Sequence, residues 1–189
     1  MLPGLFLDRD GVIIQNRDNY VRSWADVEFL PGVLDALRDF KFSPYKIVII
    51  TNQSAVGRGL MTRKTAEAIN RKMVNIITEY GGRIDGVYLC PHIPEEQCQC
   101  RKPNPGLIFQ AATDLQLDLA NSVLIGDALS DIQAGIHAGI ARLYLVLTGR
   151  GKTQAGLPAA NSIGDFEIVD SLPQALMMLL KNDPNRVDS

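Results

Sequence analysis

The chain has 189 residues, of which 46% are apolar and 21% are charged, and its formal net charge at pH 7 is −2. This composition predicts one packed domain and argues against wholesale disorder. The slight negative charge disfavours a nucleic-acid binder with a basic face, and no apolar run approaches the roughly 18 residues that a membrane span needs. The N-terminal segment has neither the basic start nor the apolar core of a secretion signal, so we expect a soluble, cytoplasmic protein. Nothing in the sequence indicates an oligomer, and we expect a monomer.

Apolar runs predict five buried strands with helices between them. The strands are expected at Leu5–Leu7, Lys46–Ile50, Val87–Leu89, Val123–Ile125 and Leu143–Leu147. The helices are expected after Pro31-Gly32, from a cap at Thr62 to a stop at Gly81-Gly82, at about 105–115, at about 130–138 and at Leu172–Lys181. This alternation predicts an α/β fold with a doubly wound (Rossmann-like) parallel sheet. We expect one domain over residues 1–181 and a flexible tail over residues 182–189.

Polar residues follow four of the predicted strands, at the sheet edge where ligands bind in doubly wound folds. They are Asp8 and Asp10 after the first strand, Thr51-Asn52-Gln53-Ser54 after the second, Arg101-Lys102 beyond the third, and Asp127, Ser130 and Asp131 after the fourth. Because the carboxyl ends of parallel strands meet at one edge, we expect these side chains to form one site.

The segment Phe6-Leu7-Asp8-Arg9-Asp10-Gly11 places two carboxylates two positions apart. If the backbone stays extended, Asp8 and Asp10 lie on one side of the strand and Arg9 points away from them. Asp and Gly are also common turn residues, so this segment alone does not distinguish a site from a turn.

The chemistry of the whole set favours phosphoryl transfer with a magnesium ion. Carboxylates without histidine suit Mg²⁺, and a threonine and a lysine beside that ion suit phosphate oxygens. A carboxylate can accept a phosphoryl group as an aspartyl phosphate. We expect Asp8 to attack phosphorus, Asp10 to carry the proton and Asp127 to hold Mg²⁺ with Asp8. Each residue taken singly has an ordinary structural explanation, such as a helix cap or a surface charge.

Four ordered motifs of the chain resemble the haloacid dehalogenase (HAD) superfamily of phosphotransferases. They are Asp8-Arg9-Asp10-Gly11, Thr51-Asn52, Lys102-Pro103 and Gly126-Asp127 followed by Asp131. The resemblance implies that Asp8 is the nucleophile and Asp10 the general acid and base. It also implies that the main-chain carbonyl of Asp10 and the Asp127 carboxylate complete the Mg²⁺ site, and that Thr51 and Lys102 bind the transferring phosphoryl group.

A receiver domain that accepts a phosphoryl group is the alternative from another functional class. Receivers also have an acidic pair, a threonine, a lysine and Mg²⁺. Their phosphoaccepting aspartate follows the third strand, whereas here that strand is followed by Cys90-Pro91-His92. The sequence therefore favours the phosphatase.

The three cysteines of the chain lie in one short loop with a histidine. Cys90, His92, Cys98 and Cys100 match the ligand set of a closed tetrahedral Zn²⁺ site. Because this set leaves no open position, we expect a structural zinc that fixes the loop and aims Arg101 and Lys102. His137 is expected to be structural.

The segments between the motifs are too short for a folded cap domain, so short loops must grip the substrate. The predicted phosphate- and substrate-binding residues are Thr51, Asn52, Gln53, Ser54, Arg58, Arg101 and Lys102. Arg17 and Arg22 are expected to be solvated surface charges. The expected partner is a small phosphorylated metabolite, not nucleic acid or a membrane.

The missing cap and the cysteine loop resemble one branch of the superfamily, the heptose-1,7-bisphosphate and histidinol-phosphate phosphatases. The segments Thr51–Gly59 and Lys102–Gly106 lean toward the heptose enzymes, which implies hydrolysis of the 7-phosphate of a sugar bisphosphate. The five residues between His92 and Cys98 lean toward the histidinol-phosphate enzymes. Val12 and Ala128 depart from the pattern, and Ala128 stands where the heptose enzymes usually have a lysine.

Overall fold

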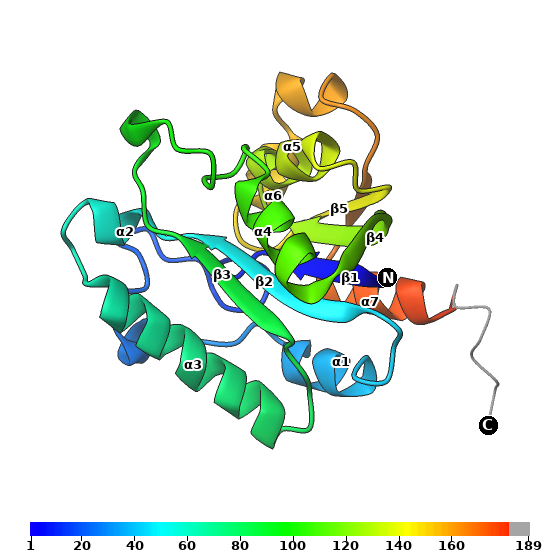
Figure 1. The fold of residues 1–189 in the computed structure, drawn as a ribbon, viewed down its shortest axis with the longest axis horizontal. Helices are drawn as coiled ribbons and strands as arrows, with labels where there is room; N and C mark the ends of the chain where they lie inside the picture. The colour runs from blue at the N-terminus through cyan, green and yellow to red at the C-terminus, as the bar shows by residue number, and fades with distance from the viewer. Residues whose placement is uncertain (182–189) are drawn as a thin grey trace.

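The computed structural model describes residues 1–181, so the tail predicted over residues 182–189 lies outside the described residues. A six-stranded parallel sheet forms the centre of the fold, in the order β3-β2-β1-β4-β5-β6 (Figure 1). The strands are β1 (Leu2–Leu7), β2 (Lys46–Asn52), β3 (Gly86–Cys90), β4 (Leu117–Gly126), β5 (Arg142–Val146) and β6 (Glu167–Val169). The predicted doubly wound α/β fold is confirmed.

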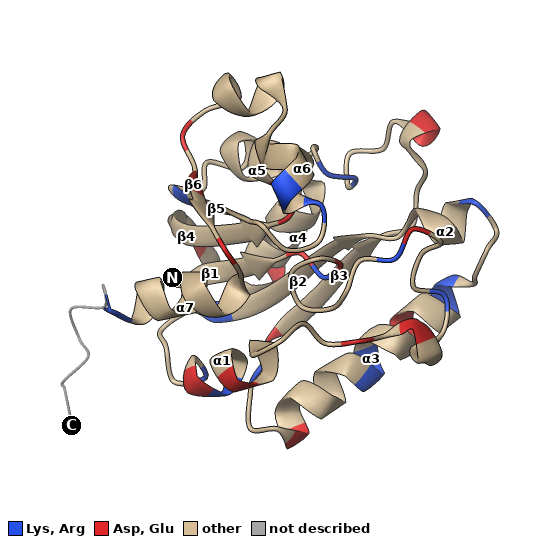
Figure 2. Cartoon of the chain, turned by 180° about the vertical axis from the view of Figure 1, so that it is seen from behind, with Lys and Arg blue, Asp and Glu red and all other residues tan. Residues whose placement is uncertain are grey.

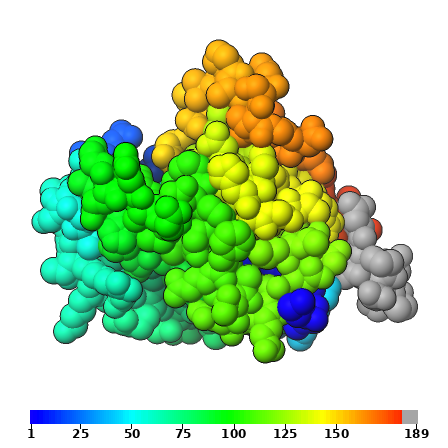
Figure 3. All heavy atoms as spheres, turned by 45° about the horizontal axis from the view of Figure 1, so that its top comes forward, coloured from blue at the N-terminus to red at the C-terminus, as the bar shows by residue number. Residues whose placement is uncertain are grey.

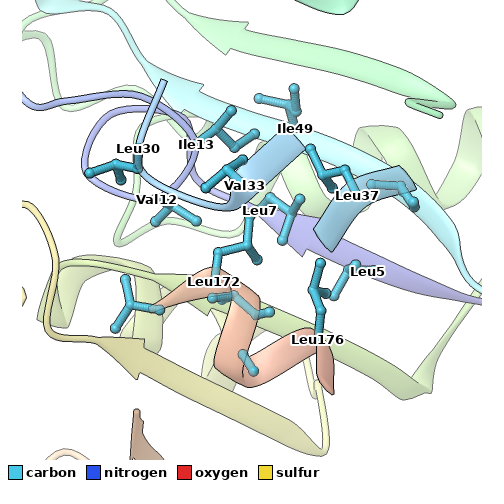
Figure 4. Close-up of a cluster of buried hydrophobic side chains, with 14 of the residues drawn as sticks. Leu5, Leu7, Val12, Ile13, Leu30, Val33, Leu37, Ile49, Leu172 and Leu176 are labelled. Carbon is cyan, nitrogen blue, oxygen red and sulfur yellow. The ribbon is translucent and has the colours of Figure 1, made fainter. Parts of the chain in front are cut away.

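Both faces of the central strands are buried, which explains their continuous apolar runs. In β1, Leu5 and Leu7 belong to the core on one face, while Phe6 belongs to the core on the other. Figure 4 shows the first of these cores, where Leu5 and Leu7 lie close to Leu172 and Leu176 of α7 (Leu172–Lys181). The strand alternation therefore connects two hydrophobic cores through one sheet.

Helices cover the two faces of the sheet. Side chains of α1 (Val33–Asp39), α3 (Arg63–Glu79) and α7 join the core that contains Leu5 and Leu7. Those of α4 (Gly106–Leu115) and α5 (Leu129–His137) join the core that contains Phe6. Acidic and basic residues are mixed along α1 and α3 (Figure 2). Thr62 caps α3 as predicted, because its hydroxyl oxygen accepts a hydrogen bond from the Thr65 amide at 3.0 Å.

Several short elements were absent from the sequence prediction. They are β6, α2 (Ser54–Gly57), α6 (Gly151–Ala155) and the 3₁₀ helices Trp24–Asp26, Pro94–Glu96 and Pro158–Asn161. Elements of three to five residues are too short to show a hydrophobic period. Thr51 and Asn52 are the last residues of β2 rather than the start of a loop. Residues 150–165, orange in Figure 3, project from the rest of the molecule.

Within the described residues 1–181, none of the segments that connect the strands forms a cap domain. None of the helices in this part is long and apolar enough to cross a membrane.

Candidate active site

A cleft of about 540 Å³ lies at the carboxyl edge of the sheet. Its walls include the segment after β1, the end of β2, the loop before α4, the start of α5 and Arg150 before α6. The predicted residues that line it are Asp8, Asp10, Asn52, Gln53, Ser54, Arg101, Lys102, Ser130 and Asp131. The structure therefore brings side chains from four separate parts of the chain into one site.

Three buried carboxylates meet beneath this cleft. Oxygens of Asp8, Asp127 and Asp131 all lie within 4.8 Å of one another. Burial, followed by repulsion from Asp8 and Asp131, raises the pKa of Asp127 to about 7. Burial also raises the pKa of Asp131. Three oxygen ligands that repel each other in this way can hold a hard divalent cation.

The trio contains Asp8 and Asp127, two of the predicted metal ligands, and adds the Asp131 carboxylate to them. The third predicted ligand is the main-chain carbonyl of Asp10, which stays a prediction. Asp131 is the first-turn acid of α5, and its carboxylate accepts a hydrogen bond from the Ala128 amide at 3.0 Å. A carboxylate four residues after Asp127 was visible in the sequence, but only the folded helix shows that it turns back into the cleft.

Lys102 links two of the three carboxylates. Its side chain is 2% exposed, and its Nζ lies 2.8 Å from an oxygen of Asp8 and 2.8 Å from an oxygen of Asp131. Burial alone would lower the pKa of Lys102, but these two carboxylates outweigh it and raise the pKa above its usual value. The Asn52 side chain holds the Lys102 backbone, with contacts of 3.1 Å to its carbonyl and 3.2 Å to its amide. The side-chain amide of Asn52, which was predicted to bind substrate, therefore holds the backbone of Lys102 in place instead.

Asp10 is held by three hydrogen bonds from the chain. Arg9 donates to both of its oxygens, each at 3.0 Å, and Gln53 Nε2 donates at 2.9 Å. Gln53 also donates to the Thr51 hydroxyl at 2.8 Å, and Arg9 donates to Asn70 Oδ1 at 2.9 Å. Asp10 is thus tied to β2 through Gln53 and to α3 through Arg9.

Arg9 would point away from the carboxylates only if the backbone stayed extended through residue 10, and this condition is not met. Strand β1 ends at Leu7, and the backbone bends at Arg9, so strict alternation of side chains stops before this residue. Its side chain is fully buried and folds back onto Asp10. The short spacing correctly indicated that Asp8 and Asp10 reach the same cleft, but not how Asp10 is held.

Asp127 has a partner that the sequence analysis missed. The Arg150 amide donates to Oδ2 of Asp127 at 2.8 Å, and Arg150 Nη2 donates to Oδ1 at 3.2 Å. A Cβ added at Gly11 or Gly149, both with positive φ, would lie 2.2 or 2.4 Å from Asp127 Oδ2, so this oxygen fits only against glycine. Arg150 follows β5 closely, so the strand-end argument would have found it if applied to the fifth strand.

The arginines proposed for substrate binding are not all at the cleft. Arg101 lines it and donates to the Ser54 hydroxyl at 3.0 Å and to the His92 carbonyl at 3.1 Å. Arg58 is exposed and does not line this cleft, whereas Arg17 does and also pairs with Glu28 at 2.8 Å. The course of the loops, which the sequence does not determine, decides this difference.

The cysteine loop, residues 90–100, gathers its four predicted ligands. The sulfurs of Cys90, Cys98 and Cys100 lie 3.2–3.6 Å apart, and His92 Nδ1 lies 3.5 Å from Cys90 and 3.2 Å from Cys100. Ligands about 2.3 Å from a tetrahedral zinc lie about 3.8 Å from one another, so this set fits such an ion. Burial is the main reason that the pKa of Cys90 lies well above its usual value.

Known proteins resemble this chain over nearly its whole length. A relative from Yersinia pestis, D-glycero-beta-D-manno-heptose-1,7-bisphosphate 7-phosphatase, is 38% identical over 177 residues, which cover 87% of this chain and 93% of the relative. The protein of the same name from Escherichia coli K12 is 37% identical and covers 93% of this chain and 94% of the relative. A HAD-hydrolase-like family model (Hydrolase_like) matches residues 99–175. The chain belongs to the HAD hydrolase family.

A solved structure of a HAD phosphatase has nearly the same fold. The D,D-heptose 1,7-bisphosphate phosphatase of B. bronchiseptica, complexed with magnesium and phosphate, aligns with a TM-score of 0.85 and 36% identity, over 94% of this chain and 98% of that one. The predictions of a HAD-type fold and of a phosphatase are confirmed. The receiver alternative is set aside, because the named relatives are phosphatases.

Proposed function

We propose that this HAD phosphatase removes the 7-phosphate of D-glycero-D-manno-heptose 1,7-bisphosphate through an aspartyl phosphate on Asp8. The observation that carries the chemistry is the buried bridge of Lys102 between Asp8 and Asp131, each at 2.8 Å. A lysine held there by two carboxylates is aimed at the place where a phosphoryl group would meet the nucleophile. The names of the relatives supply the substrate.

The carboxylate trio supports a magnesium site in this protein. Asp8 and Asp127 would hold Mg²⁺ together with the main-chain carbonyl of Asp10, and Asp131 lies beside them within reach. Burial, and after it repulsion from Asp8 and Asp131, raises the pKa of Asp127, which is the environment that a bound cation would relieve. When bound, the ion would offset the charge of the phosphate that approaches Asp8.

The remaining steps belong to the side chains of the chain itself. The Asp8 carboxylate attacks phosphorus, the bond from phosphorus to the sugar oxygen breaks, and protonated Asp10 gives its proton to that oxygen. Asp10, now ionised, then takes a proton from a water molecule. This water attacks the phosphorus of the phosphoaspartate, which releases phosphate and restores Asp8. Arg9 and Gln53 donate to the carboxylate oxygens of Asp10 and so fix the orientation of this carboxyl at the cleft.

We also propose that the cysteine loop holds a structural zinc ion. Four ligand atoms at nearly tetrahedral spacing support this proposal, and no position is left for a substrate. Arg101 follows the last ligand directly and donates to the His92 carbonyl within the loop. A fixed loop would therefore hold Arg101 at the cleft. In this proposal the loop is part of a single domain formed by residues 1–181.

The experiment that tests the substrate is a comparison of kcat/KM for heptose bisphosphate and for histidinol phosphate, with Mg²⁺ present. We expect a clear preference for heptose bisphosphate, because Arg17, Arg101 and Arg150 line the cleft and suit a second phosphate. A preference for histidinol phosphate would overturn the substrate assignment and leave the aspartyl-phosphate chemistry standing.

A further inference from the structure

We infer that Arg150 is an exchangeable partner of Asp127. In this proposal its guanidinium covers the Asp127 carboxylate while no divalent ion is bound, and turns to the non-reacting phosphate of the substrate once an ion takes its place. The second half of this inference rests on the proposed bisphosphate substrate, whereas the first half does not.

Most cations that line the cleft already have fixed partners. Lys102 contacts Asp8, Asp131 and the Ile50 carbonyl. Arg9 is buried between Asp10 and Asn70. Arg17 pairs with Glu28 and donates to the Asp26 carbonyl at 3.1 Å. Arg101 differs, because its partners Ser54 and His92 offer neutral oxygens and leave its charge available to an anion.

Arg150 combines an engaged backbone with a loosely held side chain. Its amide donates to Asp127 Oδ2 at 2.8 Å, whereas its guanidinium contacts are longer, at 3.2 Å for Nη2 and 3.5 Å for Nε. The Arg150 side chain is 52% exposed, while that of Asp127 is fully buried. Asp127 also keeps its place between Gly11 and Gly149. The guanidinium can therefore leave without releasing the carboxylate from its position.

The charges of the site favour this exchange. Three carboxylates, those of Asp8, Asp127 and Asp131, face one lysine and the Arg150 guanidinium. With a divalent ion bound, its two charges and that of Lys102 balance the carboxylates, and the charge of Arg150 becomes surplus. Ala128, next to Asp127, supplies no charge. Arg150 lines the same cleft as Arg101, so two guanidinium groups face the space where a substrate phosphate would lie.

The first test measures magnesium affinity by titration calorimetry on protein without substrate. We expect Arg150→Met to bind Mg²⁺ about three- to tenfold more tightly than the unmodified protein, because a competing cation is removed. Arg150→Lys should lie between the two. The matched control is Lys152→Met, which removes an exposed charge from α6, directly after Arg150 and outside the cleft, and should stay within about twofold. Equal or weaker Mg²⁺ binding by Arg150→Met would overturn the proposal that Arg150 covers Asp127.

The second test compares kcat/KM for heptose bisphosphate with kcat/KM for heptose 7-phosphate, which carries only the reacting phosphate. We expect the ratio of the two to fall about tenfold in Arg150→Met, mainly through KM for the bisphosphate, and to recover in part in Arg150→Lys. An unchanged ratio would overturn the substrate half of the inference. If the unmodified protein does not hydrolyse heptose bisphosphate, the proposed function fails, and the magnesium titration still decides the first half.

Discussion

The cleft and the cysteine loop both gather potential metal ligands, but they are held together in different ways. In the cleft, buried charges of opposite sign contact each other, as Lys102 does with Asp8 and Asp131. In the loop, three thiols and an imidazole lie 3.2–3.6 Å apart, and within residues 1–181 none of them has a cationic side chain as a partner. We therefore expect the sheet and its ion pairs to keep the cleft in shape without an ion, whereas the loop would depend on the proposed zinc.

This difference separates the expected consequences of losing each ion. Loss of magnesium should stop the reaction and leave the fold nearly intact. Loss of zinc should loosen residues 90–100 and reduce the reaction only through Arg101 and Lys102, which follow the loop. Changes to the cleft and to the loop should separate these two roles, and they follow from the largest expected effect to the smallest.

Replacement of Asp8, the proposed nucleophile, should have the largest effect. We expect Asp8→Asn to lower kcat by about 10⁴-fold or more, because an amide cannot accept the phosphoryl group. Phosphate release measures the loss, and circular dichroism should show an unchanged fold. The matched control is Asp18→Asn, an exposed carboxyl that lines the same cleft and should cost less than about threefold. Full activity of Asp8→Asn would refute the role of Asp8.

Replacement of Arg9, which holds the Asp10 carboxylate, should have the next largest effect on turnover. Arg9→Met removes two of the three hydrogen bonds to Asp10, so we expect kcat to fall about 10- to 100-fold with KM nearly unchanged. Arg9→Lys, which restores one donor, should recover part of kcat. A rise in KM with normal kcat would instead assign Arg9 to substrate binding, against the geometry of the site.

Loss of one zinc ligand should produce a smaller effect on turnover and a clear effect on stability. In Cys98→Ser we expect loss of bound zinc, a fall in Tm of about 5 °C or more and a roughly tenfold lower kcat/KM. Metal analysis, thermal unfolding and phosphate release measure the three quantities. A variant that binds no zinc and yet keeps full activity and Tm would show that the loop needs no ion.

The pH dependence of magnesium stabilisation should be the smallest effect. Because the pKa of Asp127 is raised to about 7, the folded metal-free protein binds a proton more tightly than the unfolded chain. Its stability should therefore fall as pH rises from about 4 to about 7, where this carboxyl ionises beside Asp8 and Asp131. We expect Mg²⁺ to raise Tm more at pH 8 than at pH 5.5. Equal shifts at both values would contradict the raised pKa.

Local patterns in the sequence predicted much of this site. Asp8 and Lys102 were found because each stands near the carboxyl edge of a parallel sheet, and the cysteine ligands because their spacing is short. The place of Arg9 depended on whether alternation continues past the end of β1, which it does not. The sequence did not show which of Arg58 and Arg17 lies at the cleft, because their distance from it depends on the course of two loops. Strand β6, with three residues, is too short to show a period.

The most direct test of the division between cleft and loop is to find where the phosphoryl group is attached during turnover. Asp10→Asn should slow both halves of the reaction, but solvent can still protonate the leaving oxygen, whereas no base remains to activate water, so the intermediate should accumulate. The variant is mixed with heptose bisphosphate and Mg²⁺, quenched in acid, digested and examined by mass spectrometry. We predict one phosphoryl group on the peptide that contains Asp8 and none on peptides from residues 90–100. Turnover without a phosphopeptide, or a phosphoryl group on any other residue, would contradict this account.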